Sequence, residues 1–182
     1  MTLLKARMSP NTIPVGKGYA LWLIPAEPIY SRLAREILRL RRKHSTPRFE
    51  PHVTLLSRIL WPEEKVLAKS ASLAGMLKPM RIRLGEIGHL NEYFRCLFFT
   101  VLPVGSIVQA RQVACGTFGL RNAAYTPHLS LIYGKLPEET PKRIATSLSS
   151  LAGRDSRVRS LALYRVNGAP REWKCIRRFA LR

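Results

Sequence analysis

One five-residue pattern occurs twice in this chain of 182 residues: a proline, a histidine, an apolar residue, a hydroxyl residue and a second apolar residue. The first copy is PHVTL at residues 51–55, and the second is PHLSL at residues 127–131. In an extended strand, alternate side chains point to the same face. Each copy therefore brings a proton-transferring ring and a neutral hydrogen-bond donor to one common face.

The residues around the two copies follow the same order, which predicts an internal duplication. Pro-Glu-Glu opens a predicted helix after each copy, at residues 62–64 and 137–139, with acidic residues in the first turn where the helix dipole favours them. Apolar patterning predicts strands before each copy and after each helix, at residues 19–24 and 96–101, and at 80–84 and 157–163. A last strand at residues 173–181 is expected to pair with the strand before it as a hairpin.

Each half is thus expected to contain a strand, a helix, the histidine strand, a second helix and a third strand. The repeat is far longer than a solenoid repeat, which favours two lobes related by pseudosymmetry. We expect an α+β fold in a single bilobal domain over residues 17–182, with approximate halves 17–90 and 91–182. Residues 1–16 are expected to form a flexible lead-in.

The first helix is predicted over residues 28–43. Leu33, Ile37 and Leu40 recur at helical spacing and predict the buried face. A stripe of arginines follows another face: Arg32, Arg35, Arg39 and Arg42. This stripe fits either a solvated outer surface or a docking surface for RNA phosphates.

The charge of the chain is strongly unbalanced, with 31 Lys and Arg against 11 Asp and Glu and a formal net charge of +20. Such a charge favours polyanionic partners such as nucleic acid, a nucleotide or an anionic membrane, although a generally basic surface is the alternative. No apolar stretch reaches the ~20 residues of a membrane span. Three cysteines without a CxxC pair are typical of a reducing compartment, so we expect a cytoplasmic protein that does not enter a membrane.

Two histidines facing a common ligand favour acid–base chemistry. With an ordinary pKa of ~6.5, one neutral and one protonated imidazole can coexist near neutral pH, so that one removes a proton while the other delivers one. A zinc site would need three or four ligands at local spacing, and a nucleophilic serine would usually occupy a strained turn. Neither string fits those patterns, so we predict no metal and no cofactor.

The paired motifs resemble those of the two-histidine (2H) phosphoesterase superfamily, whose signature is two His-x-Thr/Ser motifs in a duplicated fold. More narrowly, the chain is similar to cyclic phosphodiesterases of the plant and yeast type. The matching pieces, in chain order, are YALWLIP, PRFEPHVTL, YFRCLFF, YTPHLSLIYGKL and EWKCIRRFAL. The resemblance implies antiparallel sheets that line a central cleft, with helices packed outside.

The resemblance also implies the roles of individual residues. His52 and His128 would be the acid–base pair, with His128 assigned as base and His52 as acid. Thr54 and Ser130 would hold the phosphate oxygens. The remaining substrate-binding positions are aromatic: Tyr133, Phe94 and Trp22.

The implied activity is that of a phosphoric diester hydrolase. It would open 2′,3′-cyclic nucleotides to 2′-phosphates, or ADP-ribose 1″,2″-cyclic phosphate, as a monomer. The strong positive charge keeps a second possibility open, namely a 2H enzyme that processes RNA ends, like the 2′-5′ RNA ligases or the trimming 3′ exonucleases, on RNA with a cyclic-phosphate end. A third possibility is a module that binds RNA or nucleotides without catalysis.

Overall fold

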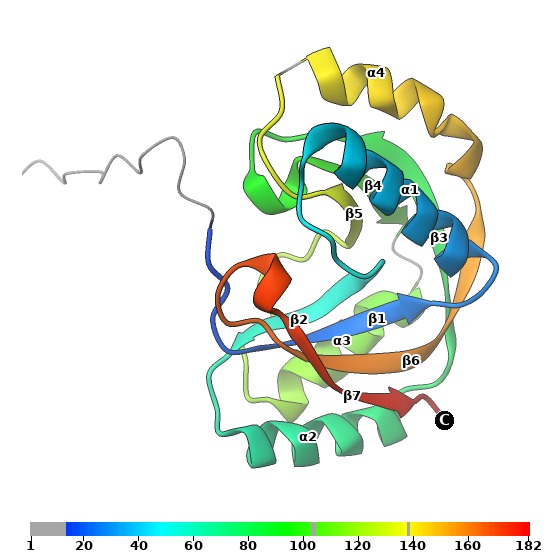
Figure 1. The fold of residues 1–182 in the computed structure, drawn as a ribbon. Coiled ribbons are helices and arrows are strands. Elements are labelled where there is room, and N and C mark those ends of the chain that lie inside the picture. The colour runs from blue at the N-terminus through cyan, green and yellow to red at the C-terminus, as the bar shows by residue number, and fades with distance from the viewer. Residues whose placement is uncertain (1–13, 103–104, 138) are drawn as a thin grey trace, which may run out of the picture.

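The sheet closes on itself (Figure 1). The computed structural model describes residues 14–102, 105–137 and 139–182. Seven strands lie in these residues: β1 (Tyr19–Pro25), β2 (Val53–Ile59), β3 (Met80–Gly88), β4 (Leu97–Leu102), β5 (His128–Ile132), β6 (Asp155–Arg165) and β7 (Lys174–Ala180). They form one antiparallel sheet in the order β1-β2-β5-β4-β3-β6-β7, and a further pairing of β1 with β6 closes the ring.

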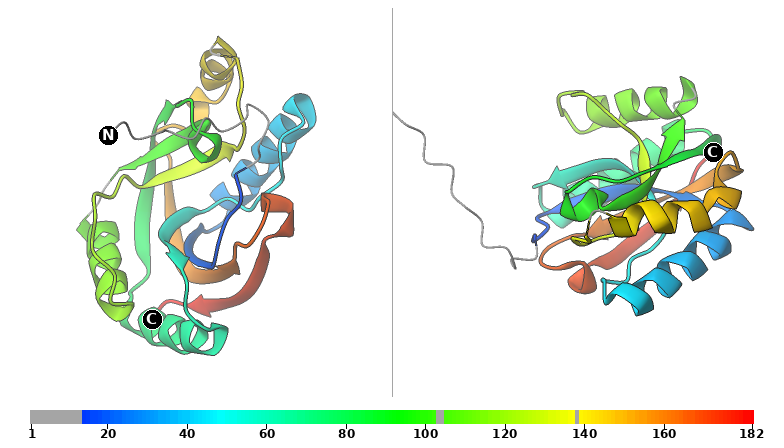
Figure 2. Two further views of the ribbon diagram at one scale, coloured as in Figure 1. Left: turned by 90° about the vertical axis from the view of Figure 1, so that its left-hand side faces the viewer. Right: turned by 90° about the horizontal axis from the view of Figure 1, so that it is seen from above.

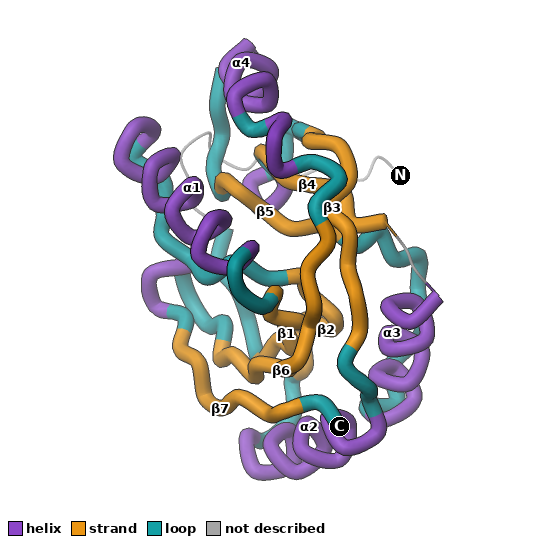
Figure 3. The backbone as a smooth tube through the Cα atoms, turned by 90° about the vertical axis from the view of Figure 1, so that its right-hand side faces the viewer, coloured by secondary structure: helices purple, strands orange, loops and turns teal. Residues whose placement is uncertain are grey.

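Helices lie on the outside of this ring (Figures 2 and 3). Those within the described residues are α1 (Ile29–His44), α2 (Glu63–Met76), α3 (Gly105–Thr117) and α4 (Glu139–Ser147). Helix α1 contacts β5 and β1, α2 contacts β7 and β6, and α3 contacts β2 and β3. Three short 3-10 helices complete the structure: η1 (Tyr93–Arg95), η2 (Ser149–Leu151) and η3 (Pro170–Glu172).

The predicted order of elements occurs in both halves, as β1-α1-β2-α2-β3 and then β4-α3-β5-α4-β6. The third strand of each half, however, pairs with the other half: β3 pairs with β4, and β6 pairs with β1. The 11-residue β6 makes this possible, because its first part pairs with β3, its last part pairs with β7, and β1 runs along its other edge. The strands therefore form one closed sheet instead of separate sheets in two consecutive halves.

Several local predictions are confirmed. Helix α1 differs by one residue at each end from its predicted range, and Leu33, Ile37 and Leu40 are all buried in the main core. Strands β6 and β7 form the expected hairpin. Most of the predicted lead-in lies outside the described residues, but Gly16 within it exchanges backbone hydrogen bonds with Gly168.

None of the helices in the described part of the chain is both long and apolar enough to cross a membrane.

Candidate active site

The two histidine strands are neighbours in the sheet, where Val53 of β2 pairs with Leu129 of β5. Both of these residues are fully buried in the core. In an antiparallel pair this register places position 52 opposite position 130, and position 54 opposite position 128. Because alternate side chains share a face, the two histidines and the two hydroxyl residues all point away from the core on the same side.

A pocket of about 720 Å³ lies over that face. Seven residues predicted from the sequence line it: His52, Thr54, His128, Ser130, Tyr133, Phe94 and Trp22. The strand register explains two of the aromatic positions, because Trp22 pairs with Thr54 across β1 and β2, and Tyr133 immediately follows β5. The tertiary structure thus brings together every candidate site residue from two halves of the chain.

The His52 side chain is buried, and its ring contacts an aromatic residue and a backbone oxygen. Its ring stacks on Trp22, with ring centroids 3.6 Å apart and planes within 10°. Nδ1 lies 2.6 Å from the backbone oxygen of Glu50. A carbonyl oxygen only accepts hydrogen bonds, so Nδ1 carries the hydrogen and Nε2 of the neutral ring is an acceptor. The hydroxyl of Tyr133 lies 3.4 Å from this Nε2.

His128 repeats this arrangement in the second half. Its Nδ1 lies 3.0 Å from the backbone oxygen of Thr126, which is again two residues earlier in the chain. Phe98 contacts the ring edge-on, with centroids 5.4 Å apart. In both histidines the same backbone contact fixes the tautomer, and Nε2 is the nitrogen left for proton exchange.

Burial disfavours the protonated form of both rings. It lowers the pKa of His52 from 6.5 to about 4, which outweighs the opposing effects of the Glu50 carbonyl and carboxylate. Burial also lowers the pKa of His128, against the stabilising effect of the Thr126 carbonyl. In the free protein the His52 ring is therefore neutral at pH 7. A neutral ring can accept a proton through Nε2, whereas the family resemblance assigned the role of acid to His52.

The two hydroxyl residues differ in their present contacts. Ser130 is buried, and its hydroxyl donates to the backbone oxygen of Phe94 at 2.9 Å. Thr54 is partly exposed in the pocket, and its backbone oxygen accepts a hydrogen bond from the Tyr125 hydroxyl at 3.1 Å. A serine hydroxyl has one hydrogen, so Ser130 must rotate away from Phe94 to donate to a ligand.

The aromatic residues divide into support and exposed wall. Trp22 is buried between His52 and Tyr164, whose ring centroid is 3.7 Å away, so it supports the histidine more than it lines the opening. Tyr133 is likewise buried and stacks on Phe49. Phe94 remains partly exposed, so of the three predicted aromatic residues it offers the most surface to a ligand.

Sequence reasoning missed part of the pocket wall. Five of the additional residues are basic or aromatic, and one is acidic: Lys17, Arg58, Arg95, Tyr93 and Trp173, with Glu92. Their signals were weak, since Tyr93 and Arg95 flank the predicted Phe94, and Trp173 begins the segment predicted as the last strand. Among the residues that the structure describes, no three His, Cys, Asp or Glu side chains gather as a metal site would require.

Comparisons with known proteins identify the family of this chain. The family described as the 2′-5′ RNA ligase superfamily matches residues 28–170. A cyclic phosphodiesterase of Arabidopsis thaliana is 27% identical over 154 residues, which cover 82% of this chain and 85% of the relative.

Solved structures share the fold at low sequence identity. The E. coli LigT structure complexed with 3′-AMP has a TM-score of 0.59 at 16% identity, over 91% of this chain and 98% of that one. TT0787 of Thermus thermophilus has a TM-score of 0.61 at 18% identity, again over 91% of this chain and 98% of the other. The match over residues 28–170, together with the paired His-x-Thr/Ser motifs, shows that the chain belongs to the 2′-5′ RNA ligase superfamily of 2H phosphoesterases.

Proposed function

We propose that this protein is a metal-independent cyclic phosphodiesterase that hydrolyses 2′,3′-cyclic nucleotides to 2′-phosphates, ADP-ribose 1″,2″-cyclic phosphate, or both. The observation that carries the proposal is the cross-strand arrangement of His52, Thr54, His128 and Ser130 over one pocket. The similarity to the Arabidopsis cyclic phosphodiesterase supports the reaction class.

The reaction needs one proton removed and one delivered. Neutral His52 accepts a proton through Nε2 from a water molecule as its oxygen bonds to phosphorus. The bond from phosphorus to the ribose 3′ oxygen breaks, and protonated His128 delivers a proton to that oxygen. The product is a 2′-phosphate, and the two histidines exchange their protonation states.

The hydroxyl residues hold the phosphate during this exchange. Thr54 lies opposite His128 and Ser130 lies opposite His52 across the pair of strands. Each hydroxyl can therefore donate to a non-bridging phosphate oxygen, while the two rings act on the attacking water and on the departing ribose oxygen. Such donors stabilise the charge that develops on these oxygens in the transition state. Phe94 is proposed to contact the base or ribose, with Tyr133 and Trp22 behind it.

Turnover of a 2′,3′-cyclic nucleotide in the presence of EDTA tests the proposal. The variants His52→Ala and His128→Ala should each lose about 10²- to 10⁴-fold in kcat. The matched control is His89→Ala, since His89 is exposed and lies outside the pocket. Full activity in either pocket variant, or loss of wild-type activity in EDTA, would contradict the metal-free two-histidine mechanism. Binding without turnover would favour a non-catalytic module.

The acid and base can be distinguished with a substrate whose bridging 3′ oxygen is replaced by sulfur. A thiolate leaves without protonation much more readily than a ribose oxygen does, because thiols are far stronger acids. We expect this substrate to restore much of the activity lost in His128→Ala and little of that lost in His52→Ala. The reverse pattern would return the base role to His128.

A further inference from the structure

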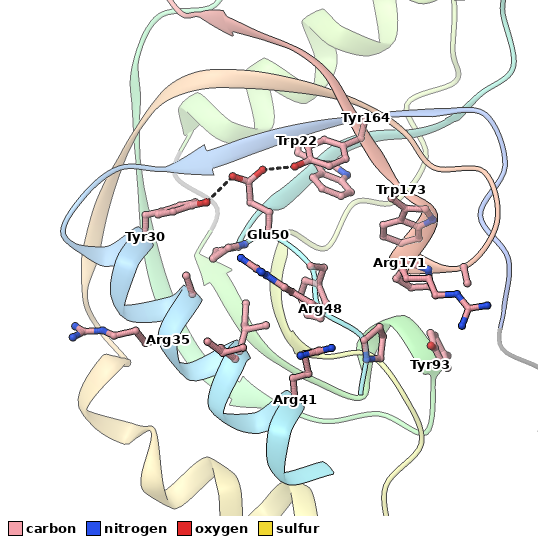
Figure 4. A pocket seen from close by; sticks show the side chains of 18 residues that line it. Trp22, Tyr30, Arg35, Arg41, Arg48, Glu50, Tyr93, Tyr164, Arg171 and Trp173 are labelled. Atoms are coloured by element: carbon pink, nitrogen blue, oxygen red, sulfur yellow. Dashed lines mark hydrogen bonds between the residues drawn. The ribbon is translucent and has the colours of Figure 1, made fainter. Parts of the chain in front are cut away.

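A second pocket of about 830 Å³ lies beside the active site (Figure 4). Its walls come from α1, from the loop 47–51 that leads into the first histidine strand, and from η3. Four arginines line it: Arg35, Arg41, Arg48 and Arg171. Figure 4 shows Arg41 and Arg48 near the middle of the pocket, Arg35 nearer the start of α1 with its side chain directed away from them, and Arg171 beside Trp173. We call this second pocket the arginine pocket.

The positive charge of the arginine pocket is not neutralised by the described part of the chain. All four arginines are exposed, and their guanidinium groups make no ion pair or hydrogen bond with a described residue. The acid in the pocket, Glu50, is already occupied, because it accepts from Tyr30 at 2.8 Å and Tyr164 at 2.6 Å and pairs with Arg178. Unpaired guanidinium groups around a cavity favour an anionic ligand, above all phosphate.

Aromatic side chains form a wall that the arginine pocket shares with the active-site pocket. Trp22, Tyr93 and Trp173 line both pockets. Trp22 is buried in this partition, but Tyr93 and Trp173 are partly exposed. A ligand that extends from the active site thus meets aromatic rings first and guanidinium groups next. Aromatic platforms combined with a basic groove are the chemistry that binds single-stranded nucleic acid.

We propose that the arginine pocket binds the nucleotide preceding the cyclic phosphate, so that an oligoribonucleotide with a 2′,3′-cyclic phosphate end spans both pockets. Its terminal phosphate lies between His52 and His128, a base stacks on Tyr93 or Trp173, and the preceding phosphodiester meets Arg41 and Arg48. This inference rests on the proposed function, because it requires the cyclic phosphate in the active-site pocket.

The test compares kcat/KM for a cyclic mononucleotide, a tetranucleotide ending in a cyclic phosphate, and ADP-ribose 1″,2″-cyclic phosphate. Wild type should prefer the tetranucleotide to the mononucleotide, and Arg41→Ala/Arg48→Ala should reduce that preference about tenfold or more. The matched control is Arg32→Ala/Arg42→Ala, which removes two exposed arginines of α1 from outside the arginine pocket. This control should retain the wild-type preference.

Salt dependence supplies a second readout that a purely structural defect would not move. Removing one phosphate-binding charge from a complex with single-stranded RNA lowers the magnitude of the slope of log affinity against log salt by about 0.7. For a fluorescent, uncleavable tetranucleotide, the slope of Arg41→Ala/Arg48→Ala should therefore be smaller in magnitude than that of wild type by about 1.4. The control variant should show the same decrease only if charge acts without regard to position, and that outcome would overturn the proposal.

The outcomes also separate this inference from the proposed function. Turnover of the mononucleotide without any preference for the tetranucleotide would overturn the inference and leave the proposed function standing. If wild type turns over none of the substrates, and Arg41→Ala/Arg48→Ala binds the tetranucleotide more weakly while the control variant does not, the result would support RNA binding in the arginine pocket and contradict the proposed function. If Arg41→Ala/Arg48→Ala lowers kcat/KM only for ADP-ribose 1″,2″-cyclic phosphate, the occupant of the arginine pocket would be a pyrophosphate-linked dinucleotide and not RNA.

Discussion

The neutral state of buried His52 should make the stability of the fold depend on pH. Burial against Trp22 lowers the pKa of His52 from 6.5 to about 4. The unfolded chain, with an ordinary pKa, therefore binds a proton between these two values while the folded protein does not. The contribution of His52 to the free energy of unfolding therefore falls as the pH drops below 6.5 and changes little above that pH.

The size of this effect follows from the two pKa values. The proton linkage of a single group with pKa 6.5 unfolded and about 4 folded amounts to about 2 kcal/mol between pH 7 and pH 5. This loss comes from the titration of His52 alone. The other titrating groups, such as the carboxylates, change the stability of wild type and of a His52 variant by the same amount, because both proteins retain them. Replacing His52 with an uncharged residue should therefore remove about 2 kcal/mol of the pH dependence, whatever it does to stability at pH 7.

Urea unfolding of wild type and His52→Gln at pH 7 and pH 5 measures the difference. The matched control is His89→Gln, because His89 is exposed and its replacement should leave the wild-type pH dependence intact. If wild type and His52→Gln lose the same stability between the two pH values, then the pKa of His52 is the same in the folded protein as in the unfolded chain. That result would refute the lowered pKa of His52, on which its assignment as the base rests.

Three further predictions concern the rate profile and the fold. Since burial lowers the pKa of both His52 and His128, the profile of kcat/KM against pH should be bell-shaped with its maximum below pH 6.5, and a monotonic profile would argue against paired histidines. Leu33→Ala should lower the free energy of unfolding by about 2–5 kcal/mol because Leu33 is fully buried, whereas Leu60→Ala, at a residue 60% exposed, should change it by less than about 1 kcal/mol. Gly18→Ala should destabilise by more than about 1 kcal/mol, because φ is +81° and the new Cβ would lie 2.3 Å from the Ile59 oxygen. Gly75→Ala, in helix α2 with open space around its Cβ, should instead stabilise by about 0.5–1 kcal/mol in thermal or urea unfolding.

Local sequence patterns were sufficient to predict the elements and the residue pairs within them. Periodicity placed Leu33, Ile37 and Leu40 on the buried face of α1, and alternation placed each histidine on one face with its hydroxyl partner. These are local properties, because side-chain direction follows from the backbone conformation of a few neighbouring residues. Repetition of the pattern then indicated that the two histidines serve one site.

The way in which the halves meet is a property of the folded chain. The pairing of Val53 with Leu129 and the exchange of β3 and β6 between halves depend on packing between segments far apart in the chain, which no local period encodes.

The surroundings of individual side chains also depend on the tertiary structure. The stack of His52 on Trp22 explains its lowered pKa, and the loop after α1 brings Arg48 beside Arg41, outside the arginine stripe that the helix pattern predicted. Burial and the charge around a pocket come from residues that folding brings together. The sequence therefore indicated the two histidines proposed to transfer protons, while the fold determined their pKa shifts and the residues that surround them.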